Sequence, residues 1–104
     1  MTRVAFKMKL KSSKIDEYKK RHNEIWPELK NAISNAGISN YSIFYDEETG
    51  ILFAYHEMSS SSSADKLCEL EIVQKWLAYM SDLTESNPDQ SPICTSLFES
   101  FHLD

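Results

Sequence analysis

The chain has 104 residues and a mass of 12.0 kDa, with 41% hydrophobic and 26% charged residues, which suits one compact domain spanning residues 1–104 and not two. The chain contains only two Gly and three Pro, a composition that is not typical of a repetitive or disordered chain. No apolar stretch reaches the length of a signal peptide or membrane span. The net charge of −5 argues against nucleic acid as a partner. We therefore expect a cytoplasmic protein that binds neither nucleic acid nor membrane.

The first predicted element is a half-buried strand over residues 3–11, where Val4, Phe6, Met8 and Leu10 alternate with mostly basic residues.

A helical pattern follows the first strand, with Ser12 and Ser13 as candidates for the N-cap. Its apolar stripe consists of Ile15, Tyr18, His22, Ile25, Trp26, Leu29 and Ile33. Pro27 lacks an amide proton, so it predicts a kink or a new helix in which it takes the first position. Gly37 is expected to end the helical region.

Two strands are predicted next, over residues 40–46 and 51–58, with a hairpin loop at residues 46–50. The second of these strands is apolar on both of its faces, so we expect both faces to be covered.

A polar linker at residues 59–63 leads to a second helical region over residues 64–83, a loop at 87–92 and a closing strand within 97–103. The order β-α-β-β-α-β predicts the ferredoxin-like α+β fold, in which helices cover one face of an antiparallel sheet. A second copy packed sheet to sheet would cover the other face, so a homodimer is expected. A ligand pocket on that face is the alternative, and the two can coexist.

The charge is unevenly spread, because the basic residues gather in residues 1–35 and the acidic residues predominate afterwards; we interpret these as solvated faces. Cys68 and Cys94 are isolated and are expected to be buried free thiols. His56 and His102 lie on predicted strands without metal-binding spacing, so no metal site is expected.

His22 is the most informative single residue, because it lies on the apolar stripe four residues after Tyr18 and four before Trp26. Its imidazole is predicted to point inward. Such a residue is either a core histidine satisfied by a hydrogen bond or an acid/base group beside a phenol and an indole. Trp76 lies at core spacing on the second helix, where a structural role is equally open.

One run of residues carries a family resemblance. Glu17-Tyr18, Arg21-His22-Asn23 and Ile25-Trp26-Pro27-Glu28-Leu29 resemble the signature of L-rhamnose mutarotases. The similarity continues through Asn40-Tyr41, Leu52-Phe53-Ala54, Trp76 to Met80, Asn87-Pro88-Asp89, Ser91-Pro92 and Phe101-His102-Leu103. It therefore spans nearly the whole chain.

The resemblance implies a dimeric ferredoxin-like α/β barrel that needs no metal or cofactor and uses a histidine as proton donor in opening the sugar ring. By motif position that histidine is His22, with Tyr18 and Tyr41 as sugar-binding residues and Trp76 as an aromatic wall. The family commonly has two adjacent tryptophans, whereas this chain has Leu77 after Trp76. Leu77 is thus the expected second sugar contact.

The implied chemistry suits these residues, because an imidazole with an ordinary pKa of about 6.5 can both take and give a proton near neutral pH. Two rival functions fit the same fold. One is a cofactor-independent monooxygenase, and the other is a ligand-binding module in which His22 is structural. A ferredoxin-like RNA binder is the weakest alternative, since no strand carries a basic-aromatic signature.

Overall fold

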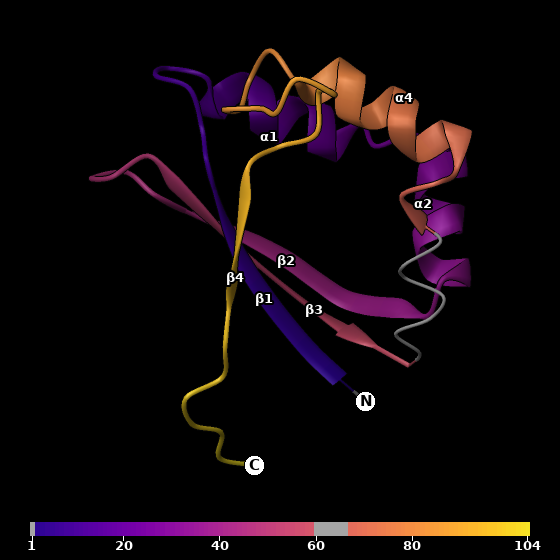
Figure 1. Ribbon diagram of the computed structural model, residues 1–104, viewed down its shortest axis with the longest axis vertical. Helices are drawn as coiled ribbons and strands as arrows, with labels where there is room; N and C mark the ends of the chain where they lie inside the picture. Colours follow the sequence, from indigo (N-terminus) through magenta and orange to yellow (C-terminus); the bar gives the residue numbers. More distant parts are fainter. Residues whose placement is uncertain (1, 60–66) are drawn as a thin grey trace.

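The protein is described here by a computed structural model that covers residues 2–59 and 67–104 (Figure 1). The predicted linker, apart from Ser59, and the first residues of the second predicted helix lie outside the described residues. The elements in chain order are β1 (Thr2–Lys9), α1 (Ile15–Asn23), α2 (Pro27–Asn35), β2 (Ile38–Asp46), β3 (Ile51–Met58), α4 (Glu71–Met80) and β4 (Cys94–Leu97).

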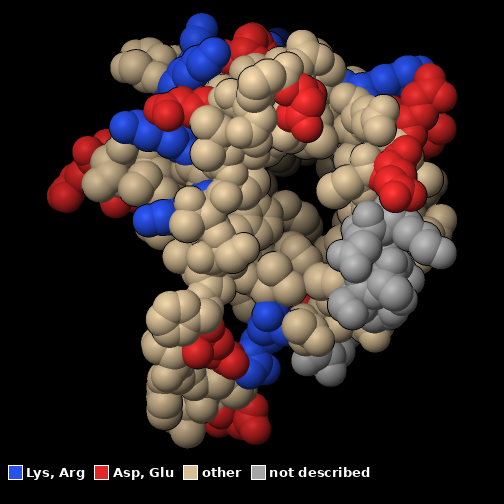
Figure 2. Space-filling view, viewed as in Figure 1, with Lys and Arg blue, Asp and Glu red and all other residues tan. Residues whose placement is uncertain are grey.

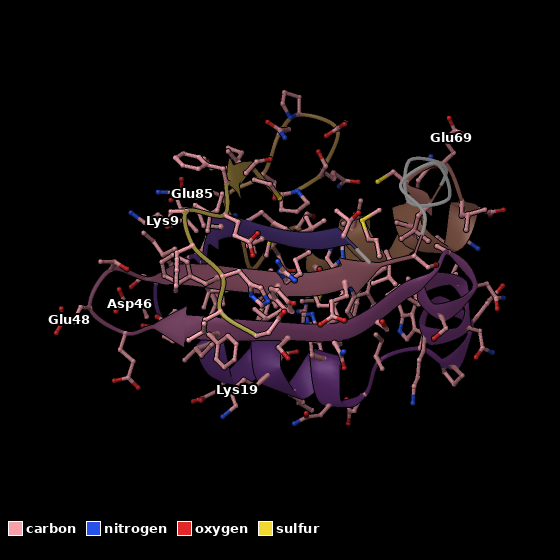
Figure 3. All side chains as sticks on the ribbon, turned by 90° about the horizontal axis from the view of Figure 1, so that it is seen from below. Lys9, Lys19, Asp46, Glu48, Glu69 and Glu85 are labelled. Atoms are coloured by element: carbon pink, nitrogen blue, oxygen red, sulfur yellow. The ribbon has the colours of Figure 1, made fainter. Side chains whose placement is uncertain are left out.

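The four strands form one antiparallel sheet in the order β2-β3-β1-β4. Helices α1, α2 and α4 all lie on the same side of this sheet (Figure 1). The ferredoxin-like arrangement predicted from the sequence is therefore confirmed. In Figure 3, Lys9 and Glu85 lie together at the end of β1, where the Glu85 amide donates to the Lys9 carbonyl at 3.0 Å.

The main core lies between the sheet and the helices. Its buried residues are Met8, Leu10, Tyr18, Leu29, Leu52, Ala54, Val73, Trp76, Met80 and Leu83. Met8 pairs with Leu52, and Phe6 pairs with Ala54, so these residues of β1 and β3 share the face beneath the helices. Since strand side chains alternate between faces, His56 of β3 lies on this face too.

The helix boundaries follow the predicted breakers, with one correction. Trp26 is extended (φ −63°, ψ 130°), Pro27 opens α2 as its first residue, and Gly37 (φ +83°) follows the end of α2. The N-cap predicted at Ser12 and Ser13 is wrong. Ser13 adopts a left-handed conformation (φ 62°), so Lys14 takes the cap position without a side-chain hydrogen bond.

The second helical region is interrupted, since Leu67 is helical but Leu70 is extended just before α4, and it ends at Met80, earlier than predicted. The closing strand is also misplaced in the prediction. Strand β4 comprises Cys94–Leu97, and residues 98–104 continue beyond the sheet as an extended tail without strand pairing (Figure 1). The apolar residues of this tail, Phe98, Phe101 and Leu103, are exposed.

Both cysteines are exposed, which corrects the prediction of buried thiols. Cys68 precedes α4 in a turn, and Cys94 begins an edge strand that has a neighbour on one side only. Among the described residues, no helix is long and apolar enough to cross a membrane.

Candidate functional site

His22 lies on the inner side of α1, half-buried, as the helical spacing predicted. Its Nδ1 atom is 3.0 Å from the carbonyl oxygen of Tyr18. A carbonyl only accepts hydrogen bonds, so Nδ1 carries the proton and donates it, and the Nε2 atom of the neutral ring is left as an acceptor. Burial lowers the pKa of His22, more strongly than this hydrogen bond raises it. The imidazole is therefore neutral at neutral pH and presents a basic nitrogen.

Aromatic rings surround this imidazole. The ring centroid of Tyr18 is 4.4 Å from that of His22, and Trp76 of α4 meets His22 edge to face at 5.5 Å. Trp76 in turn meets Trp26 at 5.1 Å, and Tyr79 packs against both indoles at 5.4 and 5.8 Å. The sequence predicted Tyr18, His22 and Trp76 together, and the structure brings these three rings together.

Tyr41 approaches the site from the sheet, on β2. A negative charge on Tyr41 would raise the pKa of Tyr18, so the two phenols interact although one comes from α1 and the other from β2. Burial raises the pKa of both phenols, that of Tyr41 to about 12. Tyr41 is nevertheless 42% exposed as a whole residue. Neither hydroxyl has a hydrogen-bond partner among the described residues, so both remain available to a ligand.

A hollow separates the helical layer from the sheet (Figure 2). The candidate site residues come from both of these layers: Tyr18 and His22 from α1, Trp76 from α4 and Tyr41 from β2. Burial raises the pKa of the Cys94 thiol on β4.

Leu77 is half-buried and packs against the main core. Its role as a sugar contact stays a prediction.

Arg21 is a further residue that the sequence reasoning did not single out, although it lies in the Arg-His-Asn run. Its guanidinium donates to Glu17 at 2.8 Å, to both carboxylate oxygens of Asp82 at 2.8 and 3.2 Å, and to the Tyr79 carbonyl at 2.6 Å. The same group lies 4.4 Å above the ring centre of Tyr79. Arg21 thus joins α1 to the end of α4, beside His22 and the aromatic cluster.

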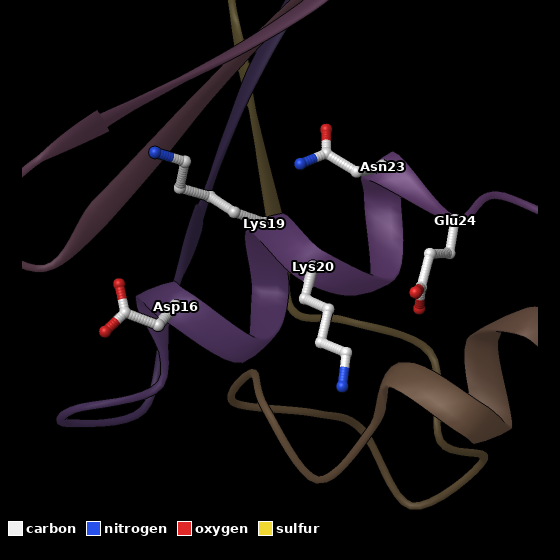
Figure 4. A pocket seen from close by; sticks show the side chains of 5 residues that line it. All are labelled: Asp16, Lys19, Lys20, Asn23 and Glu24. Atoms are coloured by element: carbon white, nitrogen blue, oxygen red, sulfur yellow. The ribbon is translucent and has the colours of Figure 1, made fainter.

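A separate, open hollow lies on the solvent side of α1 and is lined by Asp16, Lys19, Lys20, Asn23 and Glu24. Figure 4 shows these side chains leaving the helix in different directions, and their charges are of both signs. Nothing there converges on a ligand. Across residues 2–59 and 67–104, no three His, Cys, Asp or Glu side chains gather as a metal site would require. Independence from metal stays a prediction.

The fold places this chain in the structural class of ferredoxin-like proteins. A putative antibiotic biosynthesis monooxygenase from Nitrosomonas europaea superposes with a TM-score of 0.64, covering 97% of this chain and 100% of that chain at 12% identity. This likeness establishes a shared ferredoxin-like fold and nothing about chemistry.

The similarity to one family is much closer. The crystal structure of an L-rhamnose mutarotase from Formosa agariphila superposes with a TM-score of 0.93 at 44% identity, covering 100% of both chains. An L-rhamnose mutarotase from Lachnoclostridium phytofermentans is 52% identical over 104 residues, again covering 100% of both chains. The profile of the L-rhamnose mutarotase family matches residues 3–103. The chain belongs to this family, and the prediction of an isomerase that interconverts sugar anomers is confirmed over the two rival functions.

Proposed function

We propose that this protein interconverts the α and β anomers of L-rhamnose and that His22 transfers the protons. The observation that carries this assignment is the neutral imidazole of His22, fixed through Nδ1 to the Tyr18 carbonyl and in contact with the rings of Tyr18 and Trp76. The names of the family and of its relatives supply the sugar.

The reaction requires a proton to leave the anomeric hydroxyl and a proton to reach the ring oxygen. Neutral His22 accepts the first proton at Nε2. The resulting imidazolium donates it to the ring oxygen as the bond between that oxygen and C1 breaks, which leaves an open-chain aldehyde. Rotation about the C1–C2 bond turns the other face of the aldehyde to the same hydroxyl, and the transfers run in reverse on closure. General acid/base catalysis of this kind contributes about 10²- to 10⁴-fold.

The remaining site residues bind the sugar in this proposal. The hydroxyls of Tyr18 and Tyr41 have no protein partner among the described residues, so sugar hydroxyls can take that place. Burial keeps both phenols protonated, which makes them donors to the sugar and poor bases. The indole of Trp76 provides an apolar wall for the C–H face of the pyranose. Leu77, next to Trp76, supplies the second apolar contact.

The test is the rate of α/β exchange of L-rhamnose, measured by saturation-transfer NMR. His22→Ala is expected to slow exchange at least about tenfold, the low side of what acid/base catalysis supplies. Lys19→Ala is the matched control, because Lys19 lies exposed on the outer side of the same helix, and it is expected to leave the rate unchanged. A folded His22→Ala variant with the wild-type rate would refute the assignment. The same measurement on L-fucose tests the choice of sugar.

A homodimer is part of this proposal, because the sheet face away from the helices carries exposed aromatic rings. Phe44 is 66% exposed on this face, and Phe53, its neighbour across the β2/β3 pair, is 37% exposed. In the tail, Phe98, Phe101 and Leu103 are 91%, 78% and 79% exposed. So much apolar surface favours a second copy of the chain as its cover. Sedimentation at micromolar concentration is expected to give the mass of two chains, and the mass of one chain would contradict it.

A further inference from the structure

A buried histidine on the sheet takes no part in the mechanism above. His56 of β3 is 7% exposed and lies on the face beneath the helices, where its backbone pairs with Val4. Its Nδ1 atom is buried without a hydrogen-bond partner among the described residues. An unpaired buried nitrogen weakens a fold, so packing alone would favour an apolar side chain here.

His56 stands opposite an irregularity in the neighbouring strand. Ser39 pairs with Glu57 and Ser42 pairs with Tyr55, so the two residues between them on β2, Asn40 and Tyr41, face the single residue His56. This is a β-bulge, and Asn40 takes a left-handed conformation in it (φ 49°).

The bulge sends its two side chains to opposite faces of the sheet. Asn40 donates from Nδ2 to Glu57 at 3.2 Å, and the Tyr55 hydroxyl donates to the other carboxylate oxygen of Glu57 at 3.0 Å, on the outer face. Tyr41 turns to the inner face, where its ring stacks on the imidazole of His56 with centroids 5.1 Å apart and planes 30° apart. The edge of Phe6 meets that imidazole at 6.2 Å.

We propose that His56 is a positioning residue that holds the ring of Tyr41 at the angle required to bind the sugar, an inference that rests on the proposed function of the site. The bulge directs the side chain of Tyr41 inward, and the flat imidazole of His56, on which Tyr41 stacks, fixes the plane of the Tyr41 ring. Burial lowers the pKa of His56, so the stacking partner is a neutral ring at neutral pH and adds no charge beneath the phenol.

The test compares variants with and without a flat ring at position 56. His56→Leu is expected to raise KM for L-rhamnose about three- to tenfold and to leave kcat within about twofold. His56→Phe is expected to recover most of that loss, because it restores a ring under Tyr41. The melting temperature of His56→Leu is expected to equal or exceed that of the wild type, since the unpaired nitrogen is gone.

A double-mutant cycle decides whether His56 acts through Tyr41. In a Tyr41→Leu background, His56→Leu is expected to change KM less than twofold. Val4→Ala is the matched control, because it loosens the residue paired with His56 and is expected to lower the melting temperature without raising KM. If His56→Leu does not fold, His56→Phe and His56→Gln give the same comparison of ring against no ring.

The proposal is overturned if His56→Leu has a KM within twofold of the wild type. It is also overturned if His56→Leu raises KM as much in the Tyr41→Leu background as in the wild type. Either result leaves wild-type mutarotation intact. Loss of the proposed function itself would instead appear as a wild-type protein that does not exchange the anomers.

Discussion

Arg21→Gln is expected to destabilise the protein by about 2–6 kcal/mol and to slow anomer exchange. The guanidinium is 12% exposed and holds two carboxylates, one backbone carbonyl and one aromatic ring at once. Asp82 and Glu17 are 61% and 44% exposed, so each ion pair contributes only about 0.2–1 kcal/mol. The hydrogen bond from the cation to the Tyr79 carbonyl contributes about 1.5–3 kcal/mol, and the stacking on the Tyr79 ring about 0.5–1 kcal/mol.

The expected loss of activity follows from what Arg21 joins. Tyr79 packs on both indoles, and Trp76 meets His22, so releasing the end of α4 from α1 loosens the wall beside the imidazole. Misplacing a proton-transfer group reduces kcat more than KM. We expect kcat to fall about threefold or more in Arg21→Gln.

Chemical unfolding at fixed protein concentration and NMR exchange measure the two effects. Arg21→Lys keeps the charge and loses the two-pronged contact with Asp82, so it is expected to lose about half as much stability. Asp82→Asn removes one exposed ion pair and is expected to cost under about 1 kcal/mol. A loss below about 1 kcal/mol in Arg21→Gln would refute the idea that this residue joins the helices.

Most of the fold was predictable from the sequence, because the spacing of apolar residues and the positions of Pro and Gly match the strands and helices observed. The two-faced apolar pattern of residues 51–58 corresponds to a central strand, β3, whose buried residues belong to the core. Pro27 begins α2, as its missing amide proton predicts, and Gly37 follows the end of α2 with a positive φ angle. The prediction of a closing strand over residues 97–103 was wrong for the tail at residues 98–104. An exposed apolar segment has the same composition as a paired strand, so the sequence pattern does not separate the two.

The candidate site was predictable only for residues whose spacing along a helix shows which way their side chains point. Tyr18 and His22 are one turn apart, so the inward placement of His22 follows from the sequence. The contact of Arg21 with Asp82 joins residues 61 positions apart and leaves no local signal. The stacking of Tyr41 on His56 depends on a bulge at Asn40, and a one-residue bulge changes which face every later side chain takes.

Three further predictions concern pH, metal and pocket shape. Burial lowers the pKa of His22 and of His56 below 6.5, so the unfolded chain binds more protons and the free energy of unfolding should fall as pH drops below about 6.5. Urea titrations at pH 7.5 and 5.5 measure this, and equal stabilities would contradict it. Exhaustive dialysis against EDTA should leave anomer exchange unchanged, whereas a loss restored by a divalent ion would show a metal requirement. Leu77→Trp should shift KM for L-rhamnose by about twofold or more and cost under about 1.5 kcal/mol of stability, because Leu77 is only half-buried. Since Leu77 also packs against the main core, overpacking is the competing effect. The KM from NMR exchange and the free energy from urea unfolding separate the two, and a loss above about 3 kcal/mol with unchanged KM would place Leu77 in the core and not in the sugar site.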